Sequence, residues 1–219
     1  MTVQLPTQVK NDTRIKMTFA EYDEWSFQQE ARTEWVNGEV EFKVSVSTIH
    51  QNVIHFLIEL LGLYIRLFGL GRLSGGPAQV RVGENALREP DVFFVSTERL
   101  HLLTEKRMES VPDLAIEIVS AGSVLLDRQI KWQEYRDAGV KEYWIIDPRP
   151  GKERADFYQL ENDEYVLAGT EDDERYESKT LKGFWLNPSW LWDIGNIQPL
   201  LKIAEISNLS ADELFQKLA

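Results

Sequence analysis

Residues 114–119 read Leu-Ala-Ile-Glu-Ile-Val, a strongly apolar run that carries one carboxylate, Glu117. A second apolar run, Val-Phe-Phe-Val at residues 92–95, follows directly after Asp91. Runs this apolar are typical of strands in the interior of a sheet, where an unpaired carboxylate carries a large free-energy cost. Each acid therefore needs a cation, a metal ion or a water-filled cleft. The plainer alternative for either acid is a salt bridge or a strand end that faces water.

Asp91 and Glu117 together indicate a site, because they lie on two strands that we expect to be neighbours. Neighbouring strands are about 4.8 Å apart, so the two side chains can share one divalent cation. Carboxylate oxygens suit Mg²⁺ or Mn²⁺. We therefore expect both carboxylates to open to one cleft and to bind such an ion.

The hydrophobic pattern around these runs predicts a mixed α/β (α+β) domain. A long helix begins at Ser47 or Thr48, whose hydroxyl can cap it, and ends at the glycines that follow Phe68. The order helix, three strands, helix, strand predicts a mixed sheet of at least four strands with one helix on each face. The predicted helices span residues 48–68 and 125–138, and the predicted strands span 79–82, 90–95, 114–119 and 142–146.

Further patterns describe the two ends of the chain. Thr18 and Glu21 form a capping box that predicts a short helix, and Asn37-Gly38 predicts a β-hairpin. The later sequence predicts two paired strands, an apolar patch that packs back on the domain, and a C-terminal helix. These elements span residues 34–42 for the hairpin, 155–160 and 164–168 for the strands, 184–192 for the patch and 199–218 for the helix. We divide the chain into a flexible N-terminus at 1–16, one domain at 17–193 and a C-terminal helical extension at 194–219.

The composition excludes several classes of protein. The chain has 219 residues, no cysteine and a formal net charge of −12. These values exclude a disulfide framework, a thiolate metal site and a broadly basic coat for nucleic acid. Glu59 and Arg66 interrupt the most apolar segment, residues 54–70, so a buried helix is favoured over a transmembrane span. Since no apolar signal segment opens the chain, we expect a cytoplasmic protein with no membrane partner.

One cation is placed to complete the site. Asp127, Lys131 and Tyr135 are spaced i, i+4, i+8 and therefore share one face of the helix predicted at 125–138. An ammonium group directed at the two carboxylates would orient an attacking water or stabilise negative charge on a phosphate. The structural alternative is an exposed Asp–Lys pair beside a packed tyrosine.

Three segments carry a resemblance to a known family. They read Arg88-Glu-Pro-Asp-Val92, then Pro112-Asp-Leu-Ala-Ile-Glu-Ile-Val-Ser120, then Asp127-x3-Lys131-x3-Tyr135-x2-Ala-Gly-Val-Lys-Glu-Tyr-Trp-Ile-Ile-Asp-Pro148. The combination resembles the Uma-type restriction endonuclease family of the PD-(D/E)XK nuclease superfamily, over roughly residues 17–193. The last segment is the most specific of the three.

The resemblance implies a fold and an activity. The fold would be a restriction-endonuclease-like mixed central sheet flanked by helices, with an N-terminal hairpin and a C-terminal extension. The activity would be metal-dependent hydrolysis of DNA phosphodiester bonds, with Asp91 and Glu117 as ligands of Mg²⁺ or Mn²⁺. The superfamily usually carries its lysine two residues after the glutamate, where this chain has Val119. The Uma-type branch supplies the lysine from the next helix, which here is Lys131.

Four further residues are candidates for the same site. Glu34 and Glu39 flank the Asn-Gly turn, and either can reach the metal, although exposed hairpin acids are the plainer interpretation. His50 lies near the start of the long helix, where it is either a cap or packed residue or a proton carrier facing the cleft. Tyr135 can orient Lys131. No sequence motif indicates an organic cofactor.

Two other functions stay open. A catalytically inactive nuclease-fold module that binds nucleic acid or a protein partner is favoured by Val119 and by the acidic charge. A two-carboxylate hydrolase such as a glycosidase has less support, because acids that share a metal lie too close for most such pairs. Many nucleases of this kind cut two strands as dimers, so a homodimer is also open, with residues 184–192 as its candidate interface.

Overall fold

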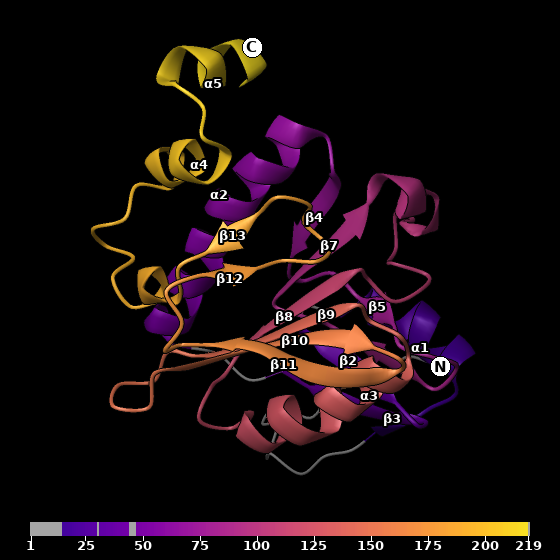
Figure 1. Cartoon of the computed structure of the whole chain (residues 1–219). Helices are drawn as coiled ribbons and strands as arrows, with labels where there is room; N and C mark the ends of the chain where they lie inside the picture. The colour runs from indigo at the N-terminus through magenta and orange to yellow at the C-terminus, as the bar shows by residue number, and fades with distance from the viewer. Residues whose placement is uncertain (1–14, 30, 44–46, 219) are drawn as a thin grey trace.

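The centre of the molecule is a six-stranded mixed sheet with the strand order β11-β10-β9-β8-β7-β4 (Figure 1). The structure is a computed structural model that describes residues 15–29, 31–43 and 47–218. Only β8 and β9 are parallel, and the other neighbours in this sheet are antiparallel. The strands are β4 (Gly71–Gly75), β7 (Val92–Ser96), β8 (Leu114–Ile118), β9 (Glu142–Asp147), β10 (Arg154–Glu161) and β11 (Glu164–Thr170).

Two helices cover opposite faces of this sheet, as the sequence predicts (Figure 1). Successive strand residues point to opposite faces, so Ile116 and Trp144 pack with α2 (Thr48–Phe68), whereas Ala115 packs with α3 (Lys131–Asp137). Glu117 has the same parity as Ala115 and therefore faces α3. The alternation thus fixes which helix can deliver a partner to the buried carboxylate.

One predicted strand belongs to a different sheet. We expected residues 79–82, 90–95 and 114–119 in one sheet, but the first of them forms β5 (Val80–Arg81), which pairs with β6 (Ala86–Arg88) in a second sheet of order β1-β3-β2-β6-β5. That prediction is wrong because the pairing of so short a strand depends on contacts that its own sequence does not encode. The remaining strands of the second sheet are β1 (Ile15–Lys16), β2 (Thr33–Val36) and β3 (Glu39–Phe42).

The strand that borders β7 is instead β4, in a glycine-rich segment that the sequence suggests only as a stop for α2. Gly71 has φ 151°, and a Cβ there would lie 2.1 Å from the carbonyl oxygen of Val95. A glycine is therefore required for β4 to approach β7 this closely. Glycine lowers strand propensity, which hides such a strand from pattern analysis.

The two helix starts and the hairpin predicted near the N-terminus are confirmed. Thr18 caps α1 (Phe19–Ser26) with a complete capping box, and Ser47 caps α2. Asn37 and Gly38 have φ 49° and 81°, the left-handed values that a tight hairpin between β2 and β3 requires. Residues 1–14 of the segment predicted to be flexible lie outside the described residues, and residues 15–16 form β1, which pairs with β3.

The C-terminal segment is two helices where the sequence predicts one. They are α4 (Pro199–Ser207) and α5 (Ala211–Leu218), separated by Asn208, whose φ of 54° ends the first helix. Ser210 and Glu213 then hydrogen-bond each other's backbone and side chain and start the second. Ile203 and Ile206 are buried in the same core as α2, so the extension packs on the domain.

The apolar patch at residues 184–192 is part of the core. It contains β13 (Trp185–Leu186), which pairs with β12 (Tyr176–Glu177), and the 3₁₀ turn η3 (Pro188–Leu191). The side chains of Phe184, Leu186 and Leu191 are buried within the chain, so the patch packs back on the domain as the sequence predicts. Its use as a dimer interface stays a prediction.

The helix α2 passes a simple test for a membrane span by length and composition alone, with half of its most apolar window buried inside the protein. Its buried residues, among them Leu57, Leu60 and Leu61, form the centre of the larger core. A core helix passes the same test, so the helix gives weak evidence for a membrane.

Candidate active site

Asp91 and Glu117 face each other across β7 and β8. Val92 pairs with Ile116, and one further step of an antiparallel register sets Asp91 opposite Glu117. The Asp91 carboxylate also accepts the backbone N–H of Ile118, with 2.8 Å between Oδ2 and N. This geometry agrees with the pairing that the sequence predicts.

Both carboxylates line one pocket with a volume of about 340 Å³. Its walls come from the start of α2, the ends of β7 and β8, the helical segment before α3, and the hairpin of the second sheet. The polar side chains in the wall are those of Arg32, Lys43, His50, Asp91, Glu117, Ser120, Ser123, Asp127 and Lys131. Acids and cations from both sheets thus converge on one cleft.

Lys131 is fully buried and donates a hydrogen bond to Glu117, with 2.7 Å from Nζ to Oε1. The same Nζ lies 3.7 Å from Asp127 Oδ1 and 3.8 Å from Glu34 Oε1. Burial alone would lower the pKa of Lys131, but the carboxylates of Glu117, Glu34 and Asp127 raise it above its usual value. The ammonium group is therefore charged and held among three acids, and the alternative of an exposed Asp–Lys pair is excluded.

A π-helical turn, η2 (Leu126–Ile130), precedes Lys131. The backbone N–H of Lys131 bonds to the carbonyl of Leu126, five residues earlier. The sequence predicts a regular α-helix here, whereas the structure has one extra residue in this turn. Single π turns inside helices are frequent at functional sites.

Glu117 accepts a second hydrogen bond on the same oxygen from the hydroxyl of Tyr135, at 2.9 Å. Burial raises the pKa of Glu117 to about 8, against the opposing effect of Lys131. The single positive charge of Lys131 is shared among Glu117, Asp127 and Glu34, so it offsets only part of the effect of burial on the Glu117 pKa. Burial raises the pKa of Asp127 as well. Burial therefore favours the protonated form of both Glu117 and Asp127.

His50 lies beside Asp91, with 3.3 Å from Nε2 to Oδ2. Burial would raise the pKa of Asp91, but the contact with His50, nearby Lys131 and the Ile118 N–H lower it, so this carboxylate stays ionised. Among the described residues, no group accepts from or donates to the buried Nδ1 of His50. The imidazole thus lines the pocket, as the more functional of the two sequence interpretations expects.

Glu34 is buried, which contradicts the interpretation of an exposed hairpin acid. Its Oε1 accepts from Lys43 at 2.9 Å and its Oε2 from Arg88 at 2.9 Å. Although burial raises its pKa, the charges of Lys131, Lys43 and Arg88 bring the pKa of Glu34 far below the usual value. Glu34 is therefore an ionised counter-charge whose oxygens already have partners.

Glu39, the other hairpin candidate, is not in the wall of this pocket. Its carboxylate lies on β3 at 3.9 Å from Lys16 Nζ. Glu34 is not in the wall either, but its buried carboxylate lies 3.8 Å from Lys131 Nζ and so contacts the site through that lysine.

Two residues of the site escape sequence analysis. The guanidinium of Arg88 is buried and bonds to Glu34, Glu41 and Glu134 at 2.8 to 2.9 Å, and so ties the hairpin to α3. Its position directly before Glu-Pro-Asp91 is the feature of the sequence that could have marked Arg88 as part of the site. Lys43 follows β3 and has no distinctive pattern around it.

The donor set fits Mg²⁺ or Mn²⁺ held mainly by two carboxylates. Within residues 15–29, 31–43 and 47–218, no group of three or more His, Asp or Glu side chains is arranged to hold a metal ion. Mg²⁺ commonly binds through only one or two carboxylates and keeps several waters. The two carboxylates of Asp91 and Glu117, which line one pocket, are consistent with that mode of binding.

Comparisons with known proteins support the family that the motifs suggest. A family model described as "Uma2: Putative restriction endonuclease" matches residues 19–189. No curated protein matches the chain. A crystal structure of a "putative nuclease belonging to DUF820" from Anabaena variabilis is similar with a TM-score of 0.63 and 15% identity, covering 78% of this chain and 97% of that one. At this identity the likeness shows a common fold. Because the family model spans most of the sequence, the chain belongs to the Uma2 family of restriction-endonuclease-like proteins.

Proposed function

We propose that this protein is a divalent-metal-dependent endonuclease that hydrolyses phosphodiester bonds of DNA. The observation that carries the proposal is the meeting of Asp91, Glu117 and Lys131 in one pocket, in a chain of a nuclease-like family. A cytoplasmic location and a homodimeric state belong to the same proposal as expectations.

Asp91 and Glu117 are the residues that would hold Mg²⁺ or Mn²⁺. Such an ion, when bound, activates water and neutralises charge on the scissile phosphate. Asp91 is ready for this role because its carboxylate is ionised. Glu117 gives up its proton more readily once positive charge is added to the pocket, since nearby positive charge lowers a carboxyl pKa.

Lys131 supplies a permanent positive charge beside these carboxylates. Its hydrogen bond to Glu117 fixes the ammonium group at the pocket wall, where it can orient a water or offset charge that develops on a phosphate. The Tyr135 hydroxyl holds the same Glu117 oxygen that Lys131 contacts. The Glu34 carboxylate helps to keep Lys131 charged.

A catalytically inactive module that binds nucleic acid or a protein is the second candidate. The observation that favours it is Val119, whose buried side chain packs in the core on the α3 face. That position therefore supplies no cation, and Lys131 has to take the place of the usual lysine.

A plasmid-nicking assay with Mg²⁺ or Mn²⁺ separates the two candidates. Wild-type protein should convert supercoiled plasmid to nicked circles, and Asp91→Asn should not. Asp163→Asn is the matched control, because this exposed aspartate lies in the turn between β10 and β11. The control variant should cleave DNA at the wild-type rate. If the wild type cleaves no DNA with either metal, the inactive module replaces the nuclease.

A further inference from the structure

A second pocket, of about 260 Å³, adjoins the active site. It lies between the end of α1 and the segment before β5, and its wall includes Phe27, Arg32, Gln79, Glu89 and Lys106. Arg32 also lines the active-site pocket. A ligand chain that occupies the active site can therefore extend into this second pocket across a single side chain.

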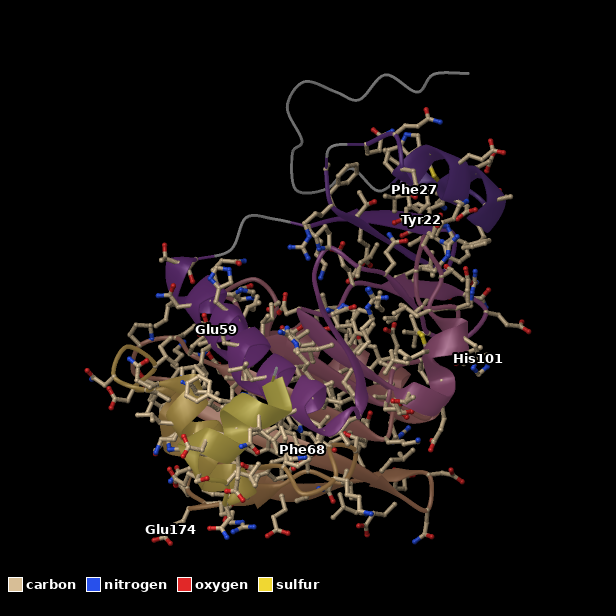
Figure 2. The ribbon with its side chains drawn as sticks, turned by 90° about the horizontal axis from the view of Figure 1, so that it is seen from above. Tyr22, Phe27, Glu59, Phe68, His101 and Glu174 are labelled. Carbon is tan, nitrogen blue, oxygen red and sulfur yellow. The ribbon has the colours of Figure 1, made fainter. Side chains whose placement is uncertain are left out.

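Phe27 presents an aromatic surface in this pocket. The residue caps the C-terminal end of α1, and 56% of its surface is exposed. Figure 2 shows it at the outer edge of the molecule. At this exposure much of the ring surface is open to a ligand.

Two cations line the same pocket, and one of them, Lys106, lies over the ring. Lys106 Nζ lies 5.2 Å from the ring centroid and 3.2 Å from Asp23 Oδ2. The guanidinium of Arg32 lies 2.8 Å from Glu89 Oε2, and 36% of its side chain is exposed. The Lys106–Asp23 pair is partly exposed, and an ion pair of that kind contributes little to stability, so Lys106 can turn to an anionic ligand at small cost. Arg32 is held by the buried carboxylate of Glu89 and keeps this partner, while the guanidinium has further N–H groups to offer a phosphate.

We propose that this pocket binds one unpaired nucleotide of the DNA strand that enters the active site. The base stacks on Phe27, and the flanking phosphates contact Arg32 and Lys106. An aromatic ring beside exposed cations is the arrangement by which proteins bind single-stranded nucleic acid. The inference rests on the proposed nuclease function and narrows its substrate to DNA with a single-stranded segment next to the cleaved bond.

The test is a binding experiment that needs no cleavage. Fluorescence anisotropy in the presence of a chelator measures affinity for a blunt duplex and for the same duplex with a short single-stranded tail. Wild-type protein should prefer the tailed duplex. Phe27→Ala should weaken binding of the tailed duplex about tenfold, a loss typical of one base–aromatic stack, and leave binding of the blunt duplex unchanged. Phe27→Trp should retain the preference, because it keeps a stacking surface.

Phe215→Ala is the matched control. This phenylalanine is 65% exposed, on α5, whose helix lies across the molecule from Phe27 (Figure 2). The control should bind both DNA molecules as the wild type does, and thermal melting should show all variants folded.

The outcomes separate this inference from the proposed function. If the wild type cleaves DNA but Phe27→Ala binds the tailed duplex as tightly as the wild type, the nucleotide pocket is wrong and the nuclease stands. Equal affinity of the wild type for the blunt and tailed duplexes would also show that the nucleotide pocket is wrong. If the wild type neither binds nor cleaves DNA, the proposed function fails and this inference fails with it.

Discussion

The ammonium nitrogen of Lys131 lies 2.7 Å from the Glu117 carboxylate, although the two residues come from different elements that are 14 positions apart in sequence. In this chain β8 provides the acid and the following helix provides the cation. Val119, directly after β8, is buried in the core on the α3 face and carries no charge, so Lys131 is the cation that contacts Glu117.

Replacing Lys131 should separate catalysis from folding. Lys131→Ala should lower metal-dependent cleavage by about 10²-fold or more, as for the loss of one group that stabilises a transition state. The variant should remain folded because Glu117, with its pKa already raised to about 8, can take up a proton instead of remaining an unpaired buried charge. The measurements are the nicking rate and a thermal melt, and normal cleavage by the alanine variant would remove Lys131 from the mechanism.

Replacing Asp91 should abolish metal binding. Asp91→Asn keeps an oxygen that can accept the Ile118 N–H but loses the negative charge that a divalent cation requires. Isothermal titration calorimetry with Mn²⁺ should show binding to the wild type and none to the variant. Unchanged binding would mean that the ion lies elsewhere.

Replacing Arg88 should lower the free energy of unfolding of the protein substantially. Arg88→Met leaves Glu34 buried without one of its charged partners, and breaking a buried ion pair from one side typically costs about 3–5 kcal/mol. Urea unfolding should show this loss. Arg175→Met, at an exposed pair with Glu177, is the matched control and should change stability by about 1 kcal/mol or less. A similar small effect at Arg88 would contradict its structural role.

Glu117 should impose a measurable pH dependence on stability without metal. Its pKa is about 8 in the folded protein and 4.5 in the ordinary state, so between these values the folded protein holds a proton that the unfolded chain releases. Stability from this group is fully present below pH 4.5 and is lost as pH rises through about 8. The slope reaches at most about 1.4 kcal/mol per pH unit. Urea unfolding of the wild type and Glu117→Gln, in a chelator, should show a flatter dependence for the variant, and parallel curves would refute the shift.

Gly71 should tolerate no side chain. Gly71→Ala places a Cβ against the Val95 carbonyl, 2.1 Å away in the present backbone, at a φ of 151°. β4 must then move away from β7, and a lower melting temperature is expected. Gly122→Ala is the control, because a Cβ there meets nothing within 4 Å.

The parts of the fold that were predictable have strong local patterns. The apolar period of α2, the capping residues Thr18 and Ser47 and the Asn37-Gly38 turn each specify an element within a few residues. β4 and the sheet of β5 were not predictable, because Gly71 looks like a helix stop and because the partner of Val80 is decided by the fold of the whole chain.

The site divides in the same way. Asp91 and Glu117 stand out because a charge within or beside an apolar run is costly, and the sequence shows that cost directly. Lys131 was predictable from its spacing with Asp127 and Tyr135 on one helix face and from the family resemblance. Arg88 and Lys43 acquire their roles from acids that are far from them in sequence: Arg88 bonds to Glu34, 54 positions away. No local pattern encodes such a pairing, and the same holds for the π turn before Lys131.

The ion pairs of Arg88 join the smaller sheet to α3, the helix that packs on the larger sheet. Glu34 and Lys43 come from the smaller sheet and its hairpin, whereas Glu117 and Lys131 come from the larger sheet and its helix. Proteins open in cooperative units that differ in free energy, and the hairpin unit has the smaller core. Partial opening of that unit would remove Glu34, one of the three acids around Lys131, while Glu117, Asp127 and the larger sheet stay in place. Hydrogen exchange should then be faster in β2 and β3 than in β8, and heating should inactivate the protein before its main sheet melts.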